Sequence, residues 1–266
     1  MKILVIGDPH GELEKIKKIS LKGIDEILLT GDLGKADLAR KRFFENLERK
    51  RQGLGELEDD ATWARKVHGQ VHNSTLGVLR YLSKCAPVYT LQGNVGIYTS
   101  SRVRKDEEKY GIKLASTREI INRMKDVHLV KNSLRVIKRL RVGFLENYSD
   151  VAWVKEFKPT DYAEKMQQAR EETEKAKRVL RRFSNLDILV CHQPPYGVLD
   201  KVTNPAAPKE WQGKHAGGKA ILDYVLKAQP RYVFCGHIHE GEGTAKIGKT
   251  EVYNLGVGGH KIIELD

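Results

Sequence analysis

A short apolar stretch that ends abruptly in turn residues opens this chain. Lys2–Ile6 is rich in aliphatic residues, and Gly7, Asp8, Pro9, His10 and Gly11 follow it directly. Such a run is typical of a strand that is buried on both faces. The glycines and the proline then force a tight loop at the carboxyl end of that strand. This loop places a carboxylate and an imidazole where open α/β sheets bind their ligands, and these groups are common metal ligands.

Four later apolar runs, each predicted to be a strand, also end in a possible ligand. They are residues 25–30 before Asp32, residues 87–92 before Asn94, residues 186–191 before His192, and residues 231–235 before His237 and His239. Because the carboxyl ends of parallel strands in one sheet meet at the same edge, we expect these polar side chains to cluster with Asp8 and His10. The chain is therefore predicted to have an α/β fold with a metal site at one sheet edge.

The seven clustered side chains are too many for one ion. Two carboxylates, four imidazoles and one amide suit two ions that share a carboxylate at a separation of about 3.5–4 Å. Mixed nitrogen and oxygen ligands favour transition metals, so we predict two divalent ions, manganese first, with iron, zinc or nickel as alternatives. Two divalent ions and two aspartates leave a net charge of about +2, which attracts and stabilises a phosphate ester in a displacement reaction.

The polar motifs and their order resemble those of the calcineurin-like metallophosphoesterase superfamily. The motifs are Asp8-x-His10, Gly31-Asp32, Gly93-Asn94, His192 and Gly236-His237-x-His239. The resemblance implies a four-layer α-β-β-α sandwich of two mixed sheets flanked by helices. It also implies one metal held by Asp8, His10 and His239, a second held by Asn94, His192 and His237, and a bridging, catalytic Asp32. A hydroxide on the metals would attack phosphorus, and Asn94 would be catalytic as well as a ligand.

One position departs from the pattern of the family. Many members carry a histidine directly after the asparagine, where it assists the transition state or protonates the leaving group, but here the residue is Val95. General acid help is worth about 10²–10⁴-fold in rate. His215 precedes a predicted helix in a glycine-rich stretch, where it or Lys214 could reach a bound anion. We predict His215 as the catalytic substitute, and a surface loop with an uninvolved histidine is the alternative.

The positive charge of the chain leaves other functions open. The net charge is +12, which raises the local concentration of nucleotides or nucleic acid, although charge-rich surfaces also occur in proteins from hot environments. Residues 36–85 are predicted to be a largely helical, strongly charged insertion at the edge of the sheet. The main prediction is a phosphodiesterase or phosphatase acting on phosphodiesters or nucleotide-type phosphates. A nuclease, or a nucleotide- or nucleic-acid-binding protein with a weakly active site, is the alternative.

The remaining sequence features predict a single cytoplasmic domain spanning residues 1–266. Cys85, Cys191 and Cys235 form no CxxC pair, so buried reduced thiols are expected rather than disulfides. Only five apolar residues precede Gly7, so no signal peptide is expected. No apolar run approaches the roughly 18 residues of a membrane span. The oligomeric state is not determined by these patterns.

Overall fold

Two β-sheets form the centre of the protein in a computed structural model, which describes residues 1–95, 97–205 and 207–265. The first sheet has five strands in the order β11-β1-β2-β3-β4 and the second has six in the order β5-β6-β7-β8-β10-β9. The strands of the first sheet are β1 (Lys2–Ile6), β2 (Glu26–Leu29), β3 (Val88–Thr90), β4 (Val127–Leu129) and β11 (His260–Glu264). Those of the second are β5 (Ser133–Ile137), β6 (Leu140–Leu145), β7 (Ile188–Cys191), β8 (Tyr232–Cys235), β9 (Gly243–Ile247) and β10 (Thr250–Asn254).

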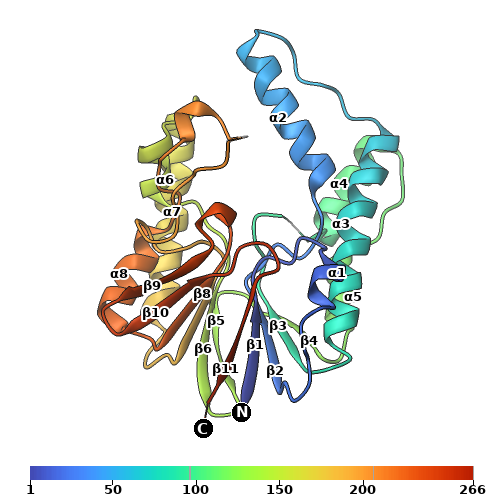
Figure 1. The fold of residues 1–266 in the computed structure, drawn as a ribbon. Coiled ribbons are helices and arrows are strands. Elements are labelled where there is room, and N and C mark those ends of the chain that lie inside the picture. Colours follow the sequence, from blue (N-terminus) through green and yellow to red (C-terminus); the bar gives the residue numbers. More distant parts are fainter. Residues whose placement is uncertain (96, 206, 266) are drawn as a thin grey trace.

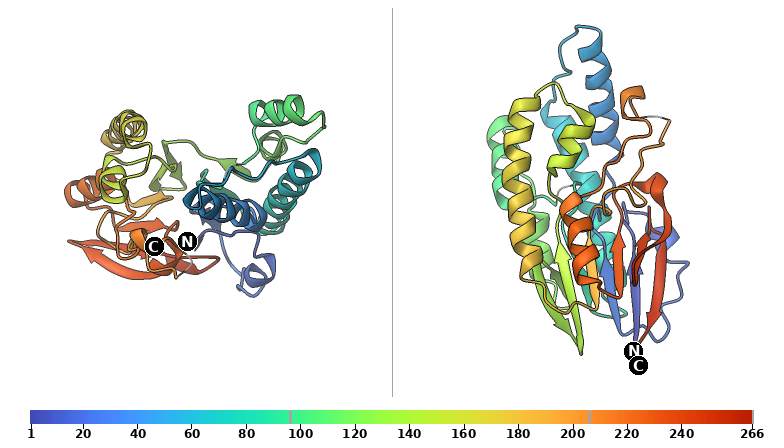
Figure 2. Two further views of the ribbon diagram at one scale, coloured as in Figure 1. Left: turned by 90° about the horizontal axis from the view of Figure 1, so that it is seen from above. Right: turned by 90° about the vertical axis from the view of Figure 1, so that its left-hand side faces the viewer.

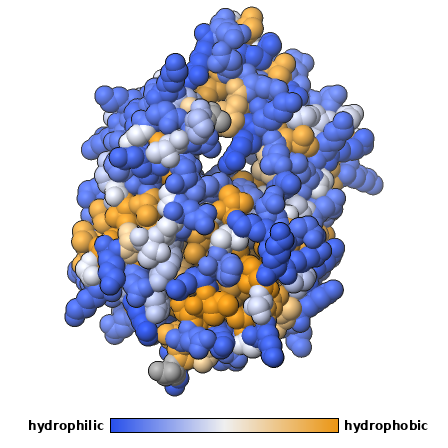
Figure 3. Space-filling view, in the orientation of Figure 1, coloured by the Kyte–Doolittle hydropathy of each residue, from blue (hydrophilic) through white to orange (hydrophobic). Residues whose placement is uncertain are grey.

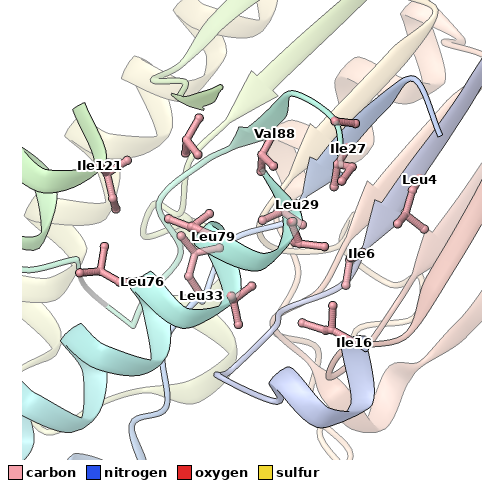
Figure 4. Packing of buried hydrophobic residues seen from close by; sticks show 14 of the residues in the cluster. Leu4, Ile6, Ile16, Ile27, Leu29, Leu33, Leu76, Leu79, Val88 and Ile121 are labelled. Carbon is pink, nitrogen blue, oxygen red and sulfur yellow. The ribbon is translucent and has the colours of Figure 1, made fainter. Parts of the chain in front are cut away.

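The two sheets pack face to face, and side chains of β1 show why. Ile3 and Val5 belong to a buried cluster that also contains Phe144 of β6 and Phe234 of β8, so this side of β1 faces the second sheet. Leu4 and Ile6 alternate with them and point to the other side, into a separate buried cluster (Figure 4). Successive side chains of a strand point to opposite faces, so an aliphatic run such as β1 is stable only when both faces are covered.

Helices cover the outer face of each sheet and complete four layers. On the first sheet lie α1 (Leu13–Ile16), α3 (Ala61–Leu82) and α5 (Thr117–Asn122), and on the second lie α7 (Tyr162–Arg181) and α8 (Lys219–Ala228). Figures 1 and 2 show these helices on either side of the paired sheets. The predicted α-β-β-α sandwich of two mixed sheets is therefore confirmed.

Residues 36–85 contain two helices with different environments. The carboxyl-terminal half of α3 buries Leu76, Leu79 and Leu82 against the first sheet, at the i, i+3 spacing of an amphipathic helix. In contrast, α2 (Asp37–Arg51) has no buried residue and extends past the strand ends (Figure 1). Further helices that the sequence did not predict are α4 (Ser100–Tyr110) and α6 (Val151–Phe157).

The pairing of the strands goes beyond what the sequence patterns indicate. The five ligand-bearing strands are divided between the two sheets, so the expectation that they share one sheet is wrong. In the first sheet, β4 runs parallel to β3. β9 and β10 pair with each other in the second sheet, whereas β11 pairs antiparallel with β1 in the first.

The structure separates the three cysteines. Cys191 and Cys235 are buried at the ends of β7 and β8, whereas Cys85 is exposed, contrary to the expectation of three buried thiols. Burial raises the pKa of the Cys191 and Cys235 thiols, so they remain protonated and unreactive at neutral pH. Among the described residues, no helix combines the length and the apolar character needed to cross a bilayer.

We predict that one thiol per chain reacts with a colorimetric disulfide reagent in the native protein and that three react after denaturation. The fast reaction belongs to Cys85, because only this thiol is exposed. Cys85→Ser should abolish the fast reaction and leave two thiols that react only in denaturant. Rapid native labelling of the Cys85→Ser variant would contradict the buried positions of the other two.

Candidate metal centre

All seven predicted ligands follow directly on strand ends that meet at one rim of the sandwich. β1, β2 and β3 run parallel in the first sheet, and β7 and β8 run parallel in the second. Since the sheets are packed face to face, the loops after these five strands lie together. Predicted ligands that are as distant in sequence as Asp8 and His239 therefore lie at the same rim.

Three side chains form one compact group of ligand atoms: Asp8, His10 and His239. The Nε2 atoms of His10 and His239 are 3.2 Å apart, and His239 Nε2 is 3.4 Å from Asp8 Oδ2. Ligand atoms that each lie about 2.0–2.2 Å from a single tetrahedral ion are roughly 3–3.6 Å from one another. The spacing of this group thus fits one metal ion.

Asn94, His192 and His237 form a second group. Asn94 Oδ1 lies 2.7 Å from His192 Nε2 and 2.7 Å from His237 Nδ1. His192 Nδ1 donates to the carbonyl of Thr30 at 3.0 Å, so when the ring is neutral its lone pair lies on Nε2. That lone pair faces the amide oxygen of Asn94, another acceptor. A cation between these acceptors would satisfy all of them, so this group also fits a metal ion.

Asp32 connects the two groups. Its Oδ2 atom is 3.6 Å from His10 Nε2 and 3.6 Å from His192 Nε2, so a single oxygen faces both groups. The other oxygen, Oδ1, accepts a hydrogen bond of 2.7 Å from the backbone N–H of Val95. This bond fixes the carboxylate and leaves Oδ2 free to bridge. The arrangement is the one expected for a carboxylate shared by two ions.

Burial and neighbouring charges set the protonation of these groups. Burial alone would raise the pKa of Asp8, but His192 and hydrogen bonds from His239, Thr30 and the His237 backbone outweigh it and lower the pKa. Burial is the main cause that lowers the pKa of His237 to about 3, and His192 lowers it further. In contrast, burial raises the pKa of Asp32, and the charges of Asp32 and Asp8 outweigh burial and raise the pKa of His192. An ionised aspartate and a neutral imidazole are the forms that bind metal ions, so metal ions compete with protons at Asp32 and His192.

The backbone around the centre is strained in a way that brings the ligands together. His10, Asp32 and His237 have φ angles of 42°, 37° and 67°, in the left-handed region that residues with a Cβ rarely adopt. Such strain persists where a site requires it. Gly93 and Gly236 permit the close approach, because a Cβ on them would lie 2.1 Å from Asp32 Oδ1 and 2.3 Å from Asp8 Oδ1.

Sequence reasoning missed Thr30, which holds two ligands at once. Its hydroxyl donates to Asp8 Oδ1 at 2.6 Å, and its carbonyl accepts from His192 Nδ1. The available signal was a lone hydroxyl residue at the end of an otherwise aliphatic run, immediately before Gly31 and Asp32. Residues that hydrogen-bond to the metal ligands fix the orientation of those ligands and the tautomer of a ligating histidine.

His215 lies in the loop between β7 and α8, described over residues 192–205 and 207–218. Its Nδ1–H donates to Asp200 Oδ1 at 2.7 Å, and Asp200 is only 1% exposed. The neighbouring Ala216 packs against Ile238, the residue between two predicted ligands. The structure therefore places the loop of His215 beside the centre and orients its ring through a buried carboxylate. Nε2 remains as the atom that can exchange a proton.

A model of the family described as calcineurin-like phosphoesterase matches residues 1–241. The chain belongs to this family. Its members are metal-dependent phosphoesterases, which agrees with the fold and with the two groups of ligand atoms at the rim. The recognition made from the spacing of the motifs is thus confirmed.

Individual relatives agree with this assignment. Human metallophosphoesterase domain-containing protein 1 is 41% identical over 73 residues, which are 27% of this chain and 20% of the human protein. The match therefore spans only about a fifth of that relative. The crystal structure of phosphopantetheinyl hydrolase (PptH) from Mycobacterium tuberculosis aligns over 97% of this chain and 89% of its own, with a TM-score of 0.55 and 13% identity. Another crystal structure aligns over 100% and 99%, with a TM-score of 0.57 and 14% identity. At these identities the two structures show a shared fold.

We predict that Thr30→Val weakens Mn²⁺ binding by about 10- to 100-fold, since Asp8 loses the hydrogen bond that orients it, while the backbone carbonyl that holds His192 is kept. The matched control is Thr250→Val, because the buried Thr250 hydroxyl has no hydrogen-bond partner in the described part of the chain. Calorimetric titration of both metal-free variants measures the effect. Equal affinities in the two variants would contradict the role of the Thr30 hydroxyl.

Proposed function

We propose that this protein is a dinuclear metal-dependent phosphoesterase that hydrolyses phosphodiesters or nucleotide-type phosphates. The observation that carries the proposal is the position of Asp32 Oδ2, at 3.6 Å from a histidine of each group. We assign Asp8, His10 and His239 to one ion, Asn94, His192 and His237 to the other, and Asp32 to both. Manganese is the first choice, with iron, zinc or nickel as alternatives. When bound, such ions lower the pKa of water and polarise a phosphoryl oxygen.

The side chains of the protein prepare this chemistry by holding the ligands in one geometry. The Thr30 hydroxyl and the backbone N–H of Val95 each occupy one oxygen of an aspartate, so the second oxygen is directed to the centre. His192 keeps its Nε2 directed inward because Nδ1 is bound to Thr30. Preorganised groups of this kind need no rearrangement during the reaction, which is the main source of electrostatic catalysis.

His215 completes the proposal as the proton donor to the leaving group. Val95 cannot act, because its aliphatic side chain has no proton to donate. Asp200 holds Nδ1–H of His215 and would stabilise the ring when Nε2 is protonated. A carboxylate that orients a histidine in this way favours one tautomer and a fixed direction of proton transfer.

The proposed function is tested by metal analysis and an activity screen of the reconstituted protein. We expect about two Mn²⁺ per chain and hydrolysis of an activated aryl phosphodiester. Asp32→Asn should reduce the stoichiometry to about one or less and remove turnover, because the bridging charge is lost. Full activity of a protein with one ion per chain would contradict the dinuclear assignment.

The leaving group tests the role of His215. An alkyl diester needs protonation more than an aryl diester does, so His215→Gln should lower the alkyl rate about 10²–10⁴-fold and the aryl rate far less. Val95→His should instead raise the alkyl rate, since it restores the histidine that the family usually carries at this position. Equal losses on both substrates in His215→Gln would contradict a proton-donor role and indicate a structural one.

A nuclease is the second candidate, favoured by the net charge of +12 and by the basic helix α2. Cleavage of single- or double-stranded DNA whose rate falls steeply with salt would support it. Two ions per chain with no turnover of any phosphoester would instead support a nucleotide- or nucleic-acid-binding protein. We also propose a cytoplasmic location and a single domain over residues 1–266.

A further inference from the structure

Helix α2 stands beside the metal centre without being fixed by a core. It begins at Asp37, shortly after the bridging ligand Asp32, and none of its 15 residues is buried. Charged residues predominate in this helix, and even Phe43 is 54% exposed, so burial of an apolar face does not anchor it. Figure 1 shows α2 rising past the strand ends, opposite the β7–α8 loop, and Figure 3 shows a hollow between these two parts of the surface.

The contacts of α2 show which neighbouring element each side of the helix faces. Arg42 lies 4.3 Å above the ring of Trp63 and pairs with Asp59 at 3.1 Å, so this side of the helix faces α3. Arg51, near the other end, pairs with Glu210 of the β7–α8 loop at 2.5 Å. At 3.6 residues per turn, Arg40 lies on the same side as Arg51, eleven residues earlier, and nearly opposite Arg42. Arg40 therefore faces the gap between α2 and the loop.

The start of α2 lies next to the ligands. Ala36, the residue before α2, packs against the same apolar cluster as Val95, whose backbone N–H donates to Asp32. Arg40 lies in the first turn of α2, on the side that faces the gap. Arg40 is exposed, and no carboxylate forms an ion pair with it in the described part of the chain. An unpaired guanidinium that faces two cation sites would repel the bound ions, and an anion between them would compensate this repulsion.

We propose that Arg40 binds the phosphate group of the substrate above the two ions, on the side left open by Val95. This inference rests on the proposed phosphoesterase function and names a residue outside the ligand set. A guanidinium is always charged and forms two parallel hydrogen bonds with phosphate oxygens, but it cannot give up a proton. The tasks of the missing histidine are thus divided, with charge stabilisation by Arg40 and protonation by His215.

The test measures binding of inorganic phosphate to the Mn²⁺-loaded protein by calorimetry. Arg40→Met should weaken phosphate binding by about 10- to 100-fold, the usual effect of losing charge-assisted hydrogen bonds, with unchanged Mn²⁺ content. The phosphate affinity of Arg40→Lys should lie between those of the unaltered protein and Arg40→Met, because a lysine keeps the charge but lacks the planar guanidinium. Lys50→Met is the matched control, since it removes one positive charge from an exposed position of the same helix.

The outcomes separate this inference from the proposed function. Unchanged phosphate affinity in Arg40→Met, an equal loss in Lys50→Met, or no phosphate binding by the unaltered protein would each overturn the role of Arg40. Arg40-dependent phosphate binding without hydrolysis of any ester would overturn the proposed function and leave Arg40 as an anion-binding residue. For an active enzyme, Arg40→Met should also raise KM for the aryl diester, and Lys50→Met should not.

Discussion

The buried carboxylates of Asp8 and Asp32 determine the arrangement of the entire rim. Both are almost fully buried between two sheets whose interiors are aliphatic and aromatic. An isolated charge in such surroundings is strongly unfavourable, so each carboxylate must be compensated by donors or cations. Thr30, Val95 and His237 supply backbone or hydroxyl donors from three different loops, and the imidazoles of three histidines lie close to the carboxylates: His10, His192 and His239. Each loop after a ligand-bearing strand is therefore held in place by the charge at the centre.

Much of this arrangement could be predicted from the sequence because its signal is local. An aliphatic run that ends in glycine and a ligand, as at Ile6 or Cys235, contains both the strand and the residue that the strand positions. The division of the strands between two sheets could not be derived this way, since β3 and β7 look alike in sequence and differ only in the layer against which they pack. The sandwich was predicted solely from the resemblance to a family.

The residues behind the ligands are harder to find for a different reason. Thr30 and Asp200 act through hydrogen bonds to partners that lie far away in the sequence or across a loop. Thr30 is marked only as a hydroxyl residue at the end of an aliphatic run, and Asp200 has no such local signal. Arg40 is one of many basic residues in a charged segment. Its distinguishing property is its direction, which depends on the contacts of Arg42 and Arg51 on other sides of the same helix.

The pairing of β1 with β11 has a consequence for how the protein folds. Lys2 lies opposite Glu264, so β1 gains one of its two neighbours from a segment that is very distant in the sequence. Closing so long a loop is entropically costly and slows folding. Until then one edge of β1 offers unpaired backbone groups to other chains. Docking of β11 therefore completes the first sheet and removes an edge to which other chains could add a strand.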